Sequence, residues 1–422
     1  MKKIGILMLV LCCSSALCAK TDPVVKEVKK TIRGAFYQTD GNEANKVRDR
    51  LNDAEKKLLE ALPKQKTARE KAQCYYYAGM VQKRFNSIEN TKLYLKVAMD
   101  TVRFYDSLYK MYTYLIQCDS VEQTGNKRLC YRTRGQKHLL KYRSNLLNGG
   151  RYYLKKKNYQ EAYRFLNMYL WSAEQPILSE FFLTQTDSMY VRAAYWATTA
   201  AYYSGNYNGV VNYAETAIEY PKNRIYIQEY ACKAYLALGD TAGWIKELKT
   251  GIINFPEHTY FFTNLMDYLN RTGQYERAME YAEHMIAYDP KRSLYWFAKA
   301  SVYMYKKDYL KCLDVCNDVL SMDSLHLGAN LFKGTCCYNL AMALSDSMKA
   351  VPVTDRRYKT YRRKMQGYCM DAVAPLEFVR AKRPDDAARW APMLYTVYLN
   401  LNKGKEFEEI DKIMNNLKTS EN

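Results

Sequence analysis

A turn-like motif recurs every 34 residues through the middle of this 422-residue chain, and this period limits the possible folds more than any other feature. The four copies are Gly205-Asn206-Tyr207, Gly239-Asp240, Gly273-Gln274-Tyr275 and Lys307-Asp308-Tyr309. Before and after the third copy, apolar residues are spaced as on one face of a helix: Phe262, Leu265, Met266 and Leu269, then Ala278, Tyr281, Ala282, Met285 and Ile286. Each period therefore predicts two amphipathic helices joined by a short turn. Because one such hairpin cannot bury its own apolar face, consecutive hairpins must stack.

A helical hairpin that repeats every 34 residues resembles the tetratricopeptide repeat (TPR), here of an exported bacterial type. That repeat has a small residue in its first helix, an aromatic residue after it, and an alanine in its second helix. The small positions are Gly150, Cys232, Ala300 and Gly334, the aromatic positions are Tyr153, Tyr235 and Tyr303, and the second-helix positions are Ala162, Ala278 and Ala372. Cys312 is a small substitute for that alanine, and Trp244 departs from the pattern. The resemblance implies an all-α fold, a right-handed superhelical array of antiparallel helix hairpins forming a TPR-like solenoid.

The register of the repeat divides the chain. The predicted parts are a signal peptide (1–19), an N-terminal helical region with one degenerate repeat (20–142), TPR-like repeats (143–344), a basic insertion (345–367), and the remainder of the sixth repeat with C-terminal capping helices (368–422). In the N-terminal region, Tyr75, Gly79 and Ala98 match the repeat loosely, whereas residues 100–120 are helical without matching it. Residues 175–188 are predicted to lengthen one connection.

The N-terminus has the three-part layout of a secretory signal. Lys2 and Lys3 precede a short apolar stretch, and small residues follow up to Ala19, where cleavage is predicted. A lipoprotein signal using Cys18 is less favoured, because Leu17 is not a small residue. No later apolar run is long enough to span a bilayer. We therefore expect an exported chain that is periplasmic or envelope-associated.

The net charge of +20 favours anionic partners. An exported protein rarely meets cytosolic nucleic acid, so none is expected as a partner. The charge indicates acidic proteins or anionic envelope polymers, or it serves only to keep the chain soluble.

No catalytic pattern is present in the sequence. The four histidines, His138, His258, His284 and His326, are scattered, and there is no HExxH motif, nucleophile elbow or phosphate-binding glycine loop. We therefore expect no enzyme activity, no cofactor and no metal.

Four cysteines are brought close together by the predicted hairpins. Cys312 and Cys316 occupy small positions of one second helix, and Cys336 and Cys337 lie on the next first helix. Buried thiols, a disulfide between the helices and a metal site are the alternatives, the first being favoured and the last remote. Their redox state is left open by the sequence.

The resemblance also implies a concave surface, lined by first helices, that binds a peptide or a partner protein. The family's groove positions fall here on Tyr195, Tyr202, Tyr226, Lys233, Asp267, Asn270, Arg271, Phe297, Tyr305 and Tyr338. The basic insertion offers a second candidate surface: Arg356, Arg357, Lys359, Arg362, Arg363 and Lys364. The sequence thus predicts a non-enzymatic exported scaffold for protein–protein interaction. The alternative is a binder of anionic or glycan envelope polymers that uses the insertion and exposed tyrosines.

Overall fold

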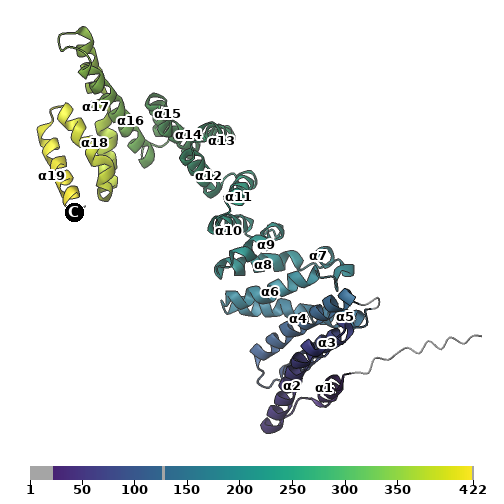
Figure 1. Ribbon diagram of the computed structural model, residues 1–422. Helices are drawn as coiled ribbons and strands as arrows, with labels where there is room; N and C mark the ends of the chain where they lie inside the picture. The colour runs from purple at the N-terminus through teal and green to yellow at the C-terminus, as the bar shows by residue number, and fades with distance from the viewer. Residues whose placement is uncertain (1–21, 126–128, 421–422) are drawn as a thin grey trace, which may run out of the picture. The chain divides into compact units, whose positions relative to one another are not determined.

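The computed structural model describes residues 22–125 and 129–420, and these form two compact units that meet in the sequence between Trp244 and Ile245. The predicted signal peptide, residues 1–19, lies outside the described residues. Every regular element within those residues is a helix, which confirms the all-α prediction (Figure 1). None of these helices combines the length and the apolar composition that crossing a membrane requires.

The helices of the first unit, up to the unit boundary within α11, are α1 (Pro23–Gly34), α2 (Gly41–Ala61), α3 (Ala68–Tyr94), α4 (Thr101–Gly125), α5 (Arg132–Lys155), α6 (Tyr159–Ala173), α7 (Leu183–Thr186), α8 (Tyr190–Tyr203), α9 (Tyr207–Ala217), α10 (Arg224–Ala237) and α11 (Thr241–Asn254). Those of the second unit are α12 (Thr259–Arg271), α13 (Tyr275–Tyr288), α14 (Ser293–Tyr305), α15 (Tyr309–Met322), α16 (Leu327–Lys349), α17 (Arg356–Lys382), α18 (Ala387–Asn400) and α19 (Gly404–Ser420). Short 3-10 turns at Leu62–Lys64, Ser179–Phe181 and Pro384–Asp386 complete the described elements.

Consecutive helices pack as hairpins, as the 34-residue period predicts. The pairs are α3 with α4, α5 with α6 and α8 with α9 in the first unit, and α12 with α13, α14 with α15, α16 with α17 and α18 with α19 in the second. Every pair of elements in substantial contact is adjacent or nearly adjacent along the chain. Each unit is therefore built from stacked local hairpins.

The recurring turn motif has a direct conformational explanation. Its first residue adopts a left-handed conformation, at Gly205 (φ 74°) and Gly239 (φ 75°) and also at the non-glycine Lys307 (φ 59°). The next residue then caps the second helix: the Asn206 side chain accepts a hydrogen bond from the Gly209 N–H at 3.0 Å, and Asp240 does the same for Gly243 at 2.9 Å. The sequence motif is thus a helix stop followed by a helix start.

The small residues of the repeat lie where helix backbones approach most closely. A Cβ atom on Gly150 would lie 2.5 Å from Leu166, and one on Gly334 would lie 2.5 Å from Leu376. Ala162, Ala278 and Ala372 are completely buried on the second helices. Their small size is therefore a packing requirement.

The N-terminal hairpins depart from the repeat length. α3 has 27 residues and α4 has 25, and Gly79 of α3 approaches Leu115 of α4. Residues 100–120, which do not match the repeat, form most of the partner helix, whereas Ala98 lies in the connection. The loose match at Ala98 therefore did not mark a second helix.

Both predicted departures from the period are visible. Residues 175–188 contain the 3-10 turn at Ser179–Phe181 and the short helix α7, and their Ile177 and Leu178 are buried. The larger insertion lengthens α16 and α17 and joins them by a turn at 350–355. Between Ala341 and Met365, all of which the structure describes, no residue is buried. The tip of this long hairpin therefore projects from the core of its own unit.

Candidate functional site

Four of the predicted groove residues lie on α8 and α10 of the first unit. The rings of Tyr202 and Tyr230 stack at 4.0 Å with an interplanar angle of 13°, and the Tyr203 and Tyr230 hydroxyls are 3.2 Å apart. Lys233 Nζ pairs with Glu229 at 3.0 Å and lies 6.0 Å from the Tyr202 ring centroid. We call Tyr202, Tyr203 and Tyr230 the tyrosine cluster.

The tyrosine cluster offers exposed aromatic area. Tyr203 is 55% exposed, and Tyr226, one turn before Tyr230 on α10, is also 55% exposed. Tyr195, by contrast, is half-buried: its ring lies 4.9 Å from that of Tyr220, and its hydroxyl accepts a hydrogen bond from Asn223 at 3.0 Å. Tyr203 was not among the predicted groove residues, although its position beside Tyr202 on α8 was the available signal.

The six predicted groove residues of the second unit have different environments. Asp267 and Arg271 are exposed on α12 and form an ion pair at 3.5 Å, whereas Asn270 between them is only 3% exposed. The Asn270 side chain is therefore buried with the neighbouring core residues instead of lining an open groove. Tyr305 is 45% exposed at the end of α14.

Phe297 and Tyr338 are partly used by packing. The Phe297 ring lies 4.9 Å from Phe332 and 4.7 Å from His326, and a Cβ atom on Gly328 would lie 2.6 Å from it. Tyr338 packs against the core shared by α16, α17 and α18. Of the six, the side chains most open to a partner are Asp267, Arg271 and Tyr305.

The basic insertion presents its cations to solvent. All six predicted residues (Arg356, Arg357, Lys359, Arg362, Arg363 and Lys364) are exposed in the first part of α17. Arg357 pairs with Asp355 at 2.7 Å, and Asp355 also caps α17. Among the described residues, no carboxylate lies within ion-pair distance of the other five.

Three of the four clustered cysteines form a contiguous group of buried thiols. Cys312, Cys316 and Cys336 are completely buried, and Cys312 Sγ donates to the carbonyl oxygen of Ala300 at 3.3 Å. Hydrogen bonds from Cys316 and Cys336 lower the pKa of Cys312, whereas the same contacts and burial raise the pKa of the other two. Cys337 is a separate buried thiol on α16. No group with metal-binding geometry occurs in the part of the chain that the structure describes.

A basic pocket that the sequence interpretation missed lies in the first unit between α1, α3 and α5. Its volume is about 400 Å³, and its lining residues are Lys29, Ile32, Arg33, Tyr76, Tyr77, Met80, Lys83, Arg84, Ser87 and Arg134. Five of them are cations and none is an acid. Tyr76 and Tyr77 meet edge to face at 5.2 Å, and Lys29 Nζ lies 4.8 Å from the Tyr77 ring centroid.

The positive charges of the basic pocket are not neutralised. No ion pair involves its five cations within the described ranges, 22–125 and 129–420. Burial lowers the pKa of Lys83, and the nearby charges of Lys141, Arg84 and Lys137 lower it further. The pocket therefore holds like charges together without an acidic partner among its lining residues.

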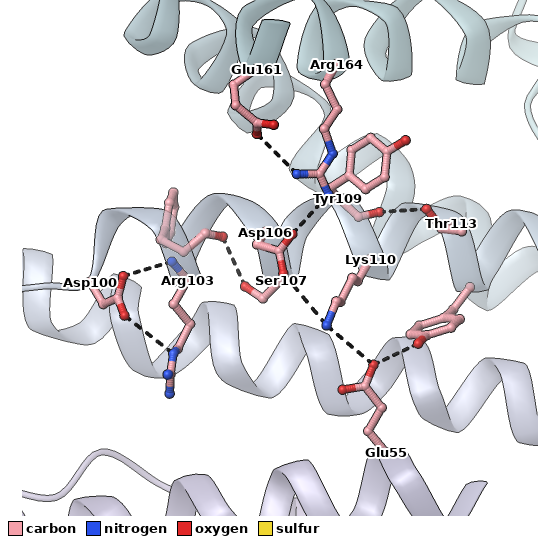
Figure 2. A network of polar contacts seen from close by, with 12 residues as sticks. Glu55, Asp100, Arg103, Asp106, Ser107, Tyr109, Lys110, Thr113, Glu161 and Arg164 are labelled. Atoms are coloured by element: carbon pink, nitrogen blue, oxygen red, sulfur yellow. Dashed lines mark hydrogen bonds and ion pairs between the residues drawn. The ribbon is translucent and has the colours of Figure 1, made fainter. Parts of the chain in front are cut away.

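The second helices of the same unit show the opposite arrangement (Figure 2). Lys110 of α4 lies 3.7 Å from Asp106 and 3.9 Å from Glu55 of α2, and Arg164 of α6 pairs with Asp106 at 3.0 Å and with Glu161 at 3.1 Å. Here each cation has a carboxylate partner on its own or a neighbouring helix. The basic pocket therefore differs from this neighbouring part of the same unit, where the positive charges are compensated.

His138 beside the basic pocket gives the first unit a predictable acid sensitivity. Burial and then the charges of Lys83, Lys137 and Lys141 lower its pKa from 6.5 to about 4. Below pH 6.5 the unfolded chain therefore binds a proton at His138, whereas this side chain stays neutral in the folded protein. The contribution of His138 to the free energy of unfolding is fully present above pH 6.5 and is lost as the pH falls towards 4.

Replacing His138 with glutamine should flatten this dependence. Because His138 is only partly buried and solvent screens its charge, we expect wild type to lose about 1 kcal/mol more than H138Q in free energy of unfolding between pH 7 and 4.5. Urea denaturation at a series of pH values measures the difference. Parallel curves for the two proteins would contradict the assignment.

Comparison with known proteins found only remote similarities to solved structures. No protein-family model matches this sequence, and no curated protein matches it. The C-terminal part of a TPR repeat-containing protein from Cytophaga hutchinsonii is 15% identical, with 62% of this chain and 92% of that chain covered and a TM-score of 0.39. Yeast Tom70 is 11% identical, with 90% and 68% covered and a TM-score of 0.30.

A further similar structure is that of the Cut9–Hcn1 hetero-tetramer of the APC/C, at 11% identity, with 93% and 75% covered and a TM-score of 0.32. The fold is instead established by the hairpins, turns and small-residue contacts of this chain itself. The fold is a TPR-like array of helical hairpins. At these levels of similarity, the TPR-like array carries no information about a particular partner.

Proposed function

We propose that this protein is an exported, non-enzymatic scaffold that holds an acidic protein partner in the cell envelope. The observation that carries the proposal is the exposed aromatic surface on α8 and α10, formed by the tyrosine cluster and Tyr226. Tyrosine is enriched at interface hot spots because it buries much area with few torsions to immobilise. The net charge of +20 favours a partner with an acidic surface.

The envelope location rests on the N-terminal signal pattern of residues 1–19. An ordinary secretory signal is favoured over the lipoprotein route through Cys18. Nucleic acid is not proposed as a partner, because export separates the chain from it.

Capture from a detergent-solubilised envelope extract tests the scaffold proposal. The full chain lacking residues 1–19 serves as bait, with washes at low and high salt and mass spectrometry as the readout. We expect one stoichiometric acidic protein to survive the high-salt wash, because a buried aromatic contact is screened less than exposed charges.

A matched pair of variants locates the contact. Y226S should reduce capture at least about tenfold, a loss typical of an interface hot spot. Y94S removes another exposed tyrosine, 86% exposed near the end of α3, and should leave capture unchanged. Equal capture by Y226S and wild type would overturn the proposed contact surface.

The second candidate function is binding of an anionic envelope polymer through the basic insertion. The five cations without a carboxylate partner on the projecting part of α17 favour it. Replacing Arg356, Arg357, Arg362 and Arg363 with serine should abolish co-sedimentation with envelope polysaccharide at low salt and should not affect capture of the protein partner. Polysaccharide binding without any captured protein would replace the scaffold proposal with this one.

A further inference from the structure

The basic pocket is a site that neither the tyrosine cluster nor the basic insertion accounts for. Its walls come from α1, α3 and α5, and its volume of about 400 Å³ falls within the range of small-molecule pockets, roughly 300–1,000 Å³. A single inorganic ion would leave most of this space unfilled. The dimensions therefore indicate an organic ligand.

The charges of the pocket indicate a strongly anionic ligand. Lys29, Arg33, Lys83, Arg84 and Arg134 supply five formal positive charges, and no lining residue is acidic. One carboxylate would neutralise only one of them, whereas each phosphate monoester carries about −1.5 to −2 charges and three acceptor oxygens at neutral pH. Arginine also matches phosphate in geometry, since its planar guanidinium can donate two parallel hydrogen bonds.

The rest of the wall is suited to a ring. Tyr77 lies beside Lys29, and Ile32 and Met80 add apolar surface, so the wall combines aromatic and aliphatic side chains with the cations. We propose that the basic pocket binds a small organic diphosphate, with the diphosphate among the five cations and its ring against Tyr77. This site is separate from the proposed protein-binding surface and does not depend on it.

The environment of Lys83 agrees with this proposal. Its pKa is lowered by burial and by neighbouring cations, so the folded protein without a ligand bears a repulsion that a bound polyanion would relieve.

Calorimetric titration of the full chain with ADP, pyrophosphate and inorganic phosphate tests the proposal. We expect saturable 1:1 binding, with ADP tightest and inorganic phosphate weakest, because only ADP offers both a diphosphate and a ring. Binding should also raise the melting temperature. Absence of saturable binding by ADP and pyrophosphate up to about 1 mM would overturn the proposal.

Matched variants assign the binding to the pocket. R33Q/R134Q removes two exposed pocket arginines and should weaken ADP binding at least about tenfold, whereas R356Q/R362Q removes two exposed arginines of the basic insertion and should leave it unchanged. Equal weakening by both double variants would show only nonspecific attraction to a basic protein, which would also overturn the proposal.

K83M distinguishes a binding role from a structural one. Removing the confined charge should raise the melting temperature of the ligand-free protein and at the same time weaken ADP binding at least about tenfold. A lower melting temperature with unchanged affinity would show that Lys83 serves folding and would contradict its place in the site. Neither result depends on capture of a protein partner.

Discussion

Replacing Asp187 with alanine is expected to lower the free energy of unfolding of the first unit by about 3–5 kcal/mol, because it leaves a buried arginine without its counterion. Arg143 of α5 is 7% exposed, and its Nε lies 3.0 Å from Asp187 Oδ2. The same carboxylate oxygen accepts a hydrogen bond from the Tyr169 hydroxyl, and the guanidinium lies 3.8 Å from the Tyr169 ring centroid. Urea denaturation followed by circular dichroism measures the loss.

Two further variants distinguish the cost of leaving a buried arginine unpaired from the cost of losing any ion pair. D53A removes a carboxylate that is 57% exposed and 3.0 Å from Lys57, and it should change stability by less than about 1 kcal/mol. R143M/D187N removes both charges and should recover much of the loss from D187A. If D187A and D53A have equal effects, the pair between Arg143 and Asp187 does not hold residues 175–188 against α5.

The second large effect is expected at Trp390 of α18. Trp390 is 1% exposed, its indole Nε1–H donates to the carbonyl oxygen of Arg383 at 2.9 Å, and it belongs to the core of α16, α17 and α18. W390A should therefore lower the free energy of unfolding by about 3–5 kcal/mol through the cavity it creates. Thermal and urea denaturation of the full chain measure this loss.

Trp296 provides the matched control for that substitution. It lies on α14 of the same unit, is only half-buried, and also donates its indole N–H to a carbonyl oxygen, that of Pro290 at 2.9 Å. W296A should cost clearly less than W390A, since less apolar surface becomes unfilled space. An equal loss for the two variants would contradict the assignment of Trp390 to the core.

The hairpins were predictable because their causes are local. A left-handed residue such as Gly205, a cap such as Asn206 and a helical spacing of apolar residues each act within a few positions. The close approach of the two helices at Gly150 was also predictable, because only a small residue fits beside Leu166. The long helices α3 and α4 were harder to predict. They are too long to fit the 34-residue period that aligned the other hairpins.

The basic pocket was not predictable from the sequence because its residues are separated along the chain. Lys29 and Arg33, Lys83 and Arg84, and then Arg134 each look like ordinary solvated positions of an amphipathic helix. Only the packing of the helices α1, α3 and α5 places them around one space. Asn270 shows the converse error: a family position expected to be open is closed by the packing of its own helix.

The contacts between near neighbours along the chain also have a mechanical consequence. Each hairpin is held mainly by the hairpins on either side of it in the sequence, and within residues 22–125 and 129–420 no extensive contact joins helices that are far apart along the chain. A pulling force on one end of such a unit would detach hairpins in succession, each step opposed by a single interface. The end-to-end length of the unit would then increase in steps under tension, and it would decrease again as the hairpins restack.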